Sequence, residues 1–169
     1  MIDLLTIEKA RKIPGDILRC KAPKDFDGII YNDDICCWWL RSPGDGSMNA
    51  AVVLPSGAVD GDGYNVDTAV RAVRPTLRIL GSLLNTLPRT KKGYVIYLDT
   101  KWIDISDYLG YPCLLKKKCM KESHRFDIKS NNYEESEVKK FIEDWYRRSL
   151  VKNFIEEWCR RMDKEYGKE

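Results

Sequence analysis

The stretch Ile35-Cys-Cys-Trp-Trp-Leu-Arg41 decides the fold, because it is apolar on both faces of the strand that it predicts. A strand of this kind lies inside a fold, since neither of its faces is suited to water. Trp38 and Trp39 point to opposite sides of such a strand, so we expect at least one of the two rings in the core. The breaker Ser42-Pro-Gly-Asp-Gly46 ends the strand.

Short strands follow along the chain. We expect a strand at 49–54, a turn at 55–57, a return strand at 58–60, a second turn at 61–63 and a further strand segment at 64–67. A longer alternating strand over 72–79 contains Pro75, which cannot donate to a ladder and therefore indicates a sheet edge or a bulge. Two more strand candidates lie at 94–98 and 101–105, and an apolar patch at 111–115 precedes the triple lysine.

Helices are predicted at both ends of the chain. Thr6 is placed to cap a helix that begins at Ile7, and Pro14 suits the first position of a second short helix. Asn132 is placed to cap a helical tail with Glu135 in its first turn. Helices at the ends and strands between them predict an α+β fold.

The tail contains an internal repeat. Val138-Lys-Lys-Phe-Ile-Glu-Asp-Trp-Tyr-Arg-Arg148 recurs as Val151-Lys-Asn-Phe-Ile-Glu-Glu-Trp-Cys-Arg-Arg161, a shift of 13 residues. At ~100° per residue, one straight helix would put Trp145 and Trp158 on nearly opposite sides. We therefore expect a break near Ser149-Leu150, which divides the chain into a domain at 1–149 and a helical extension at 150–169. The extra apolar face favours a homo-oligomer formed through the C-terminal helices.

Length and composition predict one ordinary globular domain. The 169 residues are 43% hydrophobic and 33% charged, and no apolar run is long enough for a membrane-spanning helix. Acidic residues follow the first methionine too early for a secretory signal, so we expect a cytoplasmic protein with no membrane partner. The net charge of +3 is weak for a nucleic-acid-binding domain, although Arg89-Thr-Lys-Lys92 and Lys116-Lys-Lys118 keep phosphate binding as an alternative.

The residues that could carry catalysis are few. Six cysteines without a CxxC pair predict free buried thiols in a protein without an export signal. A zinc site would have to be assembled from scattered ligands, which the spacing does not support, so we expect no metal and no cofactor. The single histidine, His124, stands in a polar segment without the buried acid that nucleophilic catalysis needs. The sequence therefore favours a protein that is not an enzyme.

The segment Asp60-Gly-Asp-Gly-Tyr-Asn-Val-Asp67 resembles a calcium loop at first sight. Tyr64 and Asn65 occupy the positions at which such a loop needs a ligand and a glycine. Hairpin turns explain the same residues, so we expect turns here, with calcium as an alternative.

Two arginines follow strongly apolar stretches. The guanidinium groups of Arg41 and Arg74 need carbonyls or an acid such as Asp45 or Asp67 to accept from their donors. We interpret both arginines as structural organisers.

Three motifs together resemble a known family. Trp38-Trp-Leu-Arg-Ser-Pro-Gly44, Ala50-Ala-Val-Val53 and Ala72-Val-Arg-Pro-Thr-Leu-Arg-Ile79 resemble the WWLRSPG/VRPAL-type domain of unknown function, common in gut bacteria, their phages and mobile elements. That domain is similar to the formylglycine-generating-enzyme and C-type-lectin-like folds. The resemblance implies a C-type-lectin-like twisted antiparallel sheet core with short N-terminal helices and a helical C-terminal extension. Residues 114–146 resemble a segment that precedes the first motif in many members, so the segment order here is permuted.

The resemblance also implies a binding face. In variable relatives, the stretch between the motifs presents changeable side chains on a rigid scaffold, and here it corresponds to residues 45–70. The side chains implied to bind are small, polar and aromatic: Ser47, Met48, Asn49, Asp60, Asp62, Tyr64 and Asn65. The cysteine pair of the related sulfatase-modifying enzymes cannot be placed on Cys36-Cys37 or on Cys113 and Cys119, which disfavours oxidase activity.

These observations favour a non-enzymatic binding protein, borne by a phage or mobile element, that recognises a protein partner in the cytoplasm. One version is an inhibitor of a host defence system. The alternatives are a nucleic-acid-binding accessory protein that uses the two basic clusters and, less favoured, an enzyme of the formylglycine-generating type. The hypothesis requires Trp38–Gly44 and Arg74–Pro75 to be neighbouring segments of a stiff β framework.

Overall fold

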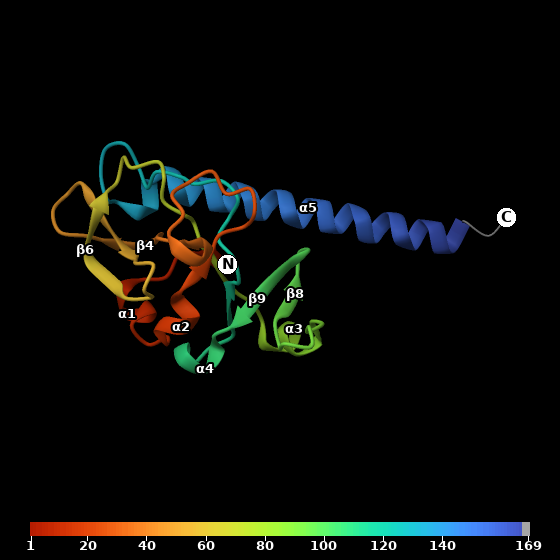
Figure 1. The fold of residues 1–169 in the computed structure, drawn as a ribbon. Coiled ribbons are helices and arrows are strands. Elements are labelled where there is room, and N and C mark those ends of the chain that lie inside the picture. The colour runs from red at the N-terminus through yellow and green to blue at the C-terminus, as the bar shows by residue number, and fades with distance from the viewer. Residues whose placement is uncertain (167–169) are drawn as a thin grey trace.

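Helices and antiparallel sheets build a body from which one long helix projects (Figure 1). The computed structural model describes residues 1–166. The helices are α1 (Ile7–Ala10), α2 (Gly15–Leu18), α3 (Gly81–Thr86), α4 (Ser106–Leu109) and α5 (Glu137–Tyr166), with short 3-10 turns η1 (Asn32–Asp34) and η2 (Tyr133–Glu135). The predicted α+β class is confirmed, and the C-type-lectin-like core stays a prediction.

Three antiparallel sheets organise the strands. The largest has the order β1-β7-β10-β9-β8, the second β4-β5-β6, and the third pairs β2 with β3. The strands are β1 (Ile2–Asp3), β2 (Cys20–Lys21), β3 (Ile35–Cys36), β4 (Trp38–Pro43), β5 (Asn49–Val53), β6 (Val59–Asn65), β7 (Thr76–Arg78), β8 (Val95–Tyr97), β9 (Thr100–Asp104) and β10 (Cys113–Lys116). Sequence-distant segments therefore meet, since β7 lies between β1 and β10.

The tryptophan stretch forms β3 and β4 and lies in the core. Trp38 and Trp39 are both fully buried, and they belong to different apolar clusters because they point to opposite sides of β4. The Trp39 ring meets Phe126 edge-on at 5.8 Å between centroids. The expectation of a tryptophan in the core is confirmed for both rings.

The two motif segments are neighbours, as the hypothesis requires. The Trp39 amide donates to the Ala72 carbonyl at 3.1 Å, and the Ala72 amide donates to the Cys37 carbonyl at 2.9 Å. The Arg74 guanidinium carbon lies 5.3 Å from the centre of the Trp38 ring. Trp38 Nε1 and Arg74 Nη1 both donate to the Leu18 carbonyl, so the motif residues and α2 are joined at one point.

Both arginines organise the fold, and the carbonyl acceptors expected for them are confirmed for Arg74, whereas the named acids, Asp45 and Asp67, are wrong. Arg41 pairs with Asp3 and Glu134, which joins β4 to β1 and η2. Within residues 1–166, the hydrogen bonds of Arg74 all end on backbone carbonyls, those of Ile17, Leu18, Lys116 and Lys117. Asp67 pairs with Arg125 instead. Packing between distant segments selects this partner, and the spacing of residues in the sequence does not reveal it.

Two strand predictions are corrected. The turn expected at 61–63 is wrong, because β6 runs through it with a register shift opposite Ala50 and Val52. Gly63 permits this irregularity: its φ is +75°, and a Cβ there would lie 2.0 Å from the Ala50 carbonyl oxygen. The strand expected over 72–79 is shortened to β7, which begins directly after Pro75 and pairs on both sides rather than at an edge.

The break predicted near Ser149-Leu150 is wrong, since α5 is one helix of 30 residues. It contains no glycine or proline, and the Ser149 hydroxyl donates to the Trp145 carbonyl at 2.9 Å within the helix. The helix therefore continues past the body, because its own backbone hydrogen bonds stabilise it where no other element packs on it. Residues 167–169 of the predicted extension lie outside the described residues.

The first copy of the repeat packs its apolar side chains on the body, whereas the large apolar side chains of the second copy are exposed. Val138 and Ile142 are fully buried, and Trp145 lies 6.4 Å from Trp102 of β9 between ring centroids. Phe154 and Trp158 of the second copy are 69% and 56% exposed. Between residues 1 and 166, no helix is both long enough and apolar enough to pass through a membrane.

Candidate functional site

The predicted binding residues gather largely at one end of the β4-β5-β6 sheet. Asn49 of β5 is the register partner of Asn65 of β6, and Ala50 is the partner of Tyr64. The turn before β5 lies against β6, because the Asp45 amide donates to the Asp62 carbonyl at 2.8 Å. Six residues are thus brought together: Ser47, Met48, Asn49, Asp62, Tyr64 and Asn65.

Asp60 is separated from this group. It pairs with Val52 farther along β6, and its carboxylate accepts from the amides of Asp62 and Gly63 at 3.1 and 3.3 Å. Those hydrogen bonds stabilise the irregular part of β6, so Asp60 shapes the face more than it presents a free carboxylate.

Asn131 holds the predicted turn in place from a distant part of the chain. Its side-chain Nδ2 donates to the carbonyls of Gly46 and Asn49 at 2.8 and 3.0 Å. Its backbone amide donates to the Ser47 carbonyl at 3.1 Å. The exposed tip at Ser47 and Met48 is therefore fixed before any partner arrives.

Tyr64 belongs to a patch that sequence reasoning missed. The guanidinium carbon of Arg71 lies 3.9 Å from the centre of the Tyr64 ring, and Arg71 Nη1 donates to the Tyr31 hydroxyl at 3.1 Å. Arg71 is 7% exposed, and its buried Nε has no hydrogen-bond partner within residues 1–166. The cation thus fixes two half-exposed tyrosines at one place.

Two exposed isoleucines extend this patch. Ile29 and Ile30 are 43% and 44% exposed, and the Ile29 amide donates to the Val70 carbonyl at 3.1 Å, beside Arg71. We call these five residues the tyrosine–arginine patch: Ile29, Ile30, Tyr31, Tyr64 and Arg71. The available sequence signal was an Ile-Ile-Tyr run inside an otherwise polar loop at 21–34.

The surroundings of the patch are acidic. Between Arg41 and Arg71 the chain has four aspartates and no lysine or arginine. Asp45 and Asp62 are exposed and joined through their backbones, whereas Asp67 is paired with Arg125 at 2.8 Å. Asp45 and Asp62 are thus two exposed carboxylates that lie close together at this end of the sheet.

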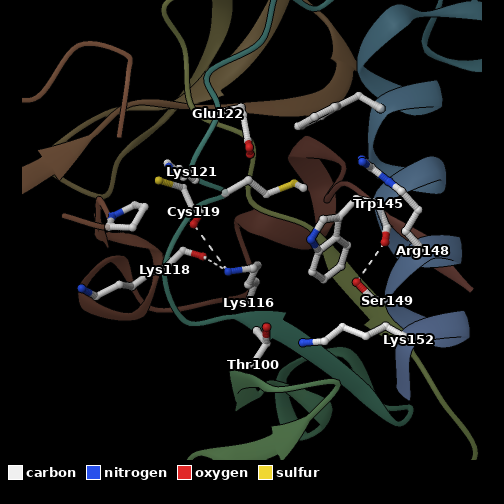
Figure 2. A pocket seen from close by; sticks show the side chains of 13 residues that line it. Thr100, Lys116, Lys118, Cys119, Lys121, Glu122, Trp145, Arg148, Ser149 and Lys152 are labelled. Carbon is white, nitrogen blue, oxygen red and sulfur yellow. Dashed lines mark hydrogen bonds between the residues drawn. The ribbon is translucent and has the colours of Figure 1, made fainter. Parts of the chain in front are cut away.

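A hollow of about 760 Å³ lies between α5 and the segment that follows β10 (Figure 2). Figure 2 shows Trp145, Arg148 and Lys152 on α5 facing Lys116 and Cys119. Five cationic side chains line it against one carboxylate, that of Glu122: Lys116, Lys118, Lys121, Arg148 and Lys152. We call this hollow the basic pocket.

Lys116 is the innermost cation of the basic pocket. Its ammonium donates to the carbonyls of Lys118 and Cys119 at 3.3 and 3.5 Å, and burial lowers the pKa of this amine. In the other predicted basic cluster, Arg89 pairs with Asp104 at 2.9 Å. The structure therefore brings Lys116 and Lys118 together with α5 residues.

His124 has a structural setting. Its ring is stacked on Phe141 of α5 at 4.6 Å between centroids, and its carbonyl accepts from Trp39 Nε1 at 2.8 Å. Its Nδ1 contacts the Arg125 carbonyl at 2.7 Å. These contacts join the 120s segment to α5 and β4.

No protein-family model matches this chain, and neither a curated protein nor a solved structure was found to match it.

Proposed function

We propose that this chain is a non-enzymatic binding protein that recognises a protein partner through the tyrosine–arginine patch. The observation that carries the proposal is the fixing of Tyr31 and Tyr64 by one buried cation, Arg71. Tyrosine and arginine dominate the binding energy of protein interfaces, and side chains already held in place lose less entropy on binding. Exposed Ile29 and Ile30 add apolar area beside the two rings.

The partner that fits this patch has a basic surface. The carboxylates of Asp45 and Asp62 lie on the same exposed end of the sheet as Tyr64, and no lysine or arginine occurs between Arg41 and Arg71. Opposite charges across an interface mainly raise the association rate and select the partner. With the family resemblance, we infer a cytoplasmic host protein, and inhibition of a host defence system is one version.

The test is affinity capture from host-cell extract with wild-type bait and a matched pair of variants. Tyr64 and Tyr108 are 37% and 38% exposed, so Y64A and Y108A remove the same side chain at equal exposure. We expect Y64A to lose the captured protein and Y108A to retain it. D62N should weaken capture at low salt more than D107N on α4. Equal recovery by wild type and Y64A would contradict the proposed surface.

A second candidate function is the binding of single-stranded nucleic acid in the basic pocket. The observation that favours it is the set of five cations around Trp145, since phosphates bind cations and bases stack on aromatic rings. In a titration against salt, loss of two phosphate contacts in a K118A/R148A double variant should reduce the slope by about 1.4. K91A/K92A is the control of equal charge change. A wild-type affinity that does not change with salt would exclude this function.

A further inference from the structure

Three cysteines that are far apart in the sequence meet inside the body. Cys20 of β2 is the register partner of Cys36 of β3, and Cys119 follows β10. Their sulfur atoms lie within 4.8 Å of one another, and each residue is at most 1% exposed. The cysteine spacing in the sequence did not support a zinc site, whereas the fold brings these three cysteines together.

The arrangement fits a tetrahedral zinc ion with little movement. Zinc–sulfur bonds of about 2.3 Å put the sulfurs of a tetrahedral site about 3.8 Å apart. The three thiols therefore need to approach by at most about 1 Å. The Cys36 thiol donates to the Cys20 carbonyl at 3.3 Å, which holds these two residues side by side.

The buried positive charge of Arg74 favours an anionic group beside it. Arg74 is fully buried, and its hydrogen bonds within the described chain all end on carbonyls. Burial lowers the pKa of Arg74, whereas the cysteine cluster acts to raise it.

We propose that Cys20, Cys36 and Cys119 bind one Zn²⁺ ion as thiolates. Three thiolates and Zn²⁺ carry a net charge of −1, which balances the +1 of Arg74 in a region with little water. Binding is not a redox step: three thiol protons pass to solvent as three Zn–S bonds form. Three cysteine ligands leave the fourth position of a tetrahedral ion for a water. The ion would join β2, β3 and the segment after β10.

The first test needs no variant. The chain is purified under reducing conditions, all six thiols are counted under denaturing conditions, and the metal content per chain is measured. We expect one zinc per chain, and replacement by Co²⁺ should give the intense absorption of thiolate–cobalt charge transfer. A fully reduced chain that neither contains zinc nor binds Co²⁺ would overturn the proposal. So would a disulfide that consumes two of the three thiols.

The second test assigns the ligands. C20S, C36S and C119S should each lose the charge-transfer band, whereas C37S and C113S, which alter equally buried cysteines outside the cluster, should retain it. Circular dichroism monitors folding in every variant. Retention of stoichiometric zinc by folded C36S would overturn the assignment, as would its loss in C37S.

Discussion

Ile142 and Ile155 occupy equivalent positions in the repeat of α5, which offers a matched pair of perturbations. Ile142 is fully buried in the cluster that contains Leu4, Trp39 and Val138, whereas Ile155 is 50% exposed. The two residues differ in what they touch and not in sequence context. The substitutions I142A and I155A therefore measure how strongly the first half of α5 is attached to the body.

The magnitudes follow from burial. Truncation of a fully buried isoleucine to alanine removes its transfer free energy and leaves a cavity, so I142A should lower the free energy of unfolding by about 3 kcal/mol. I155A should change it by less than about 0.5 kcal/mol, because a surface substitution in a helix leaves no cavity and alanine favours the helix. The loss of unfolding free energy is thus predicted to be at least about five times larger for I142A than for I155A.

Urea unfolding monitored by circular dichroism gives both values. Equal losses in the two variants would refute the reasoning, because they would mean that both copies of the repeat are equally buried. A loss of less than about 1 kcal/mol for I142A would refute the packing of α5 on the body.

Three further predictions concern single side chains. R74M removes the donor to the carbonyls of Ile17, Lys116 and Lys117, while Leu18 keeps the one from Trp38, and should cost about 3 kcal/mol in urea unfolding, against less than about 1 kcal/mol for exposed R78M. Burial alone would raise the pKa of Asp104, but hydrogen bonds from Arg89 and Ser106 hold it below 3.8. D104N should therefore lower the melting temperature at neutral pH, and its effect should vanish as the pH falls below 3.8 through the folded-state pKa. Cys159 is exposed, whereas burial raises the pKa of Cys37 and Cys113 to about 11. A maleimide at neutral pH should therefore modify one thiol per chain rapidly, and C159S should abolish that reaction.

The sequence by itself determined the local elements with strong periodicity or caps. Apolar residues on both faces of Ile35–Arg41 predicted a buried strand, and Thr6 predicted the start of α1, where its hydroxyl accepts from the Lys9 amide at 3.2 Å. The adjacency of Trp38–Gly44 and Arg74–Pro75 was also expected, from the family resemblance. These predictions held because they depend on neighbours in the chain or on a short, specific motif.

Other features required the tertiary structure. The continuity of α5 could not be judged from the repeat, because an exposed apolar stripe is tolerated when a helix projects beyond the body. The tyrosine–arginine patch joins Tyr31, Tyr64 and Arg71 through contacts across the fold. Spacing gave no indication of either arrangement.

The cysteine cluster shows the same limit most clearly. Cys20 and Cys36 meet through the register of two short strands. Cys119 lies beside them in a structure in which β10, the strand before it, pairs with β7. Each contact depends on the free energy of the whole packed body, in which long-range burial outweighs local preference. A local pattern therefore specifies which element forms, and the packing of distant elements decides which side chains share a site.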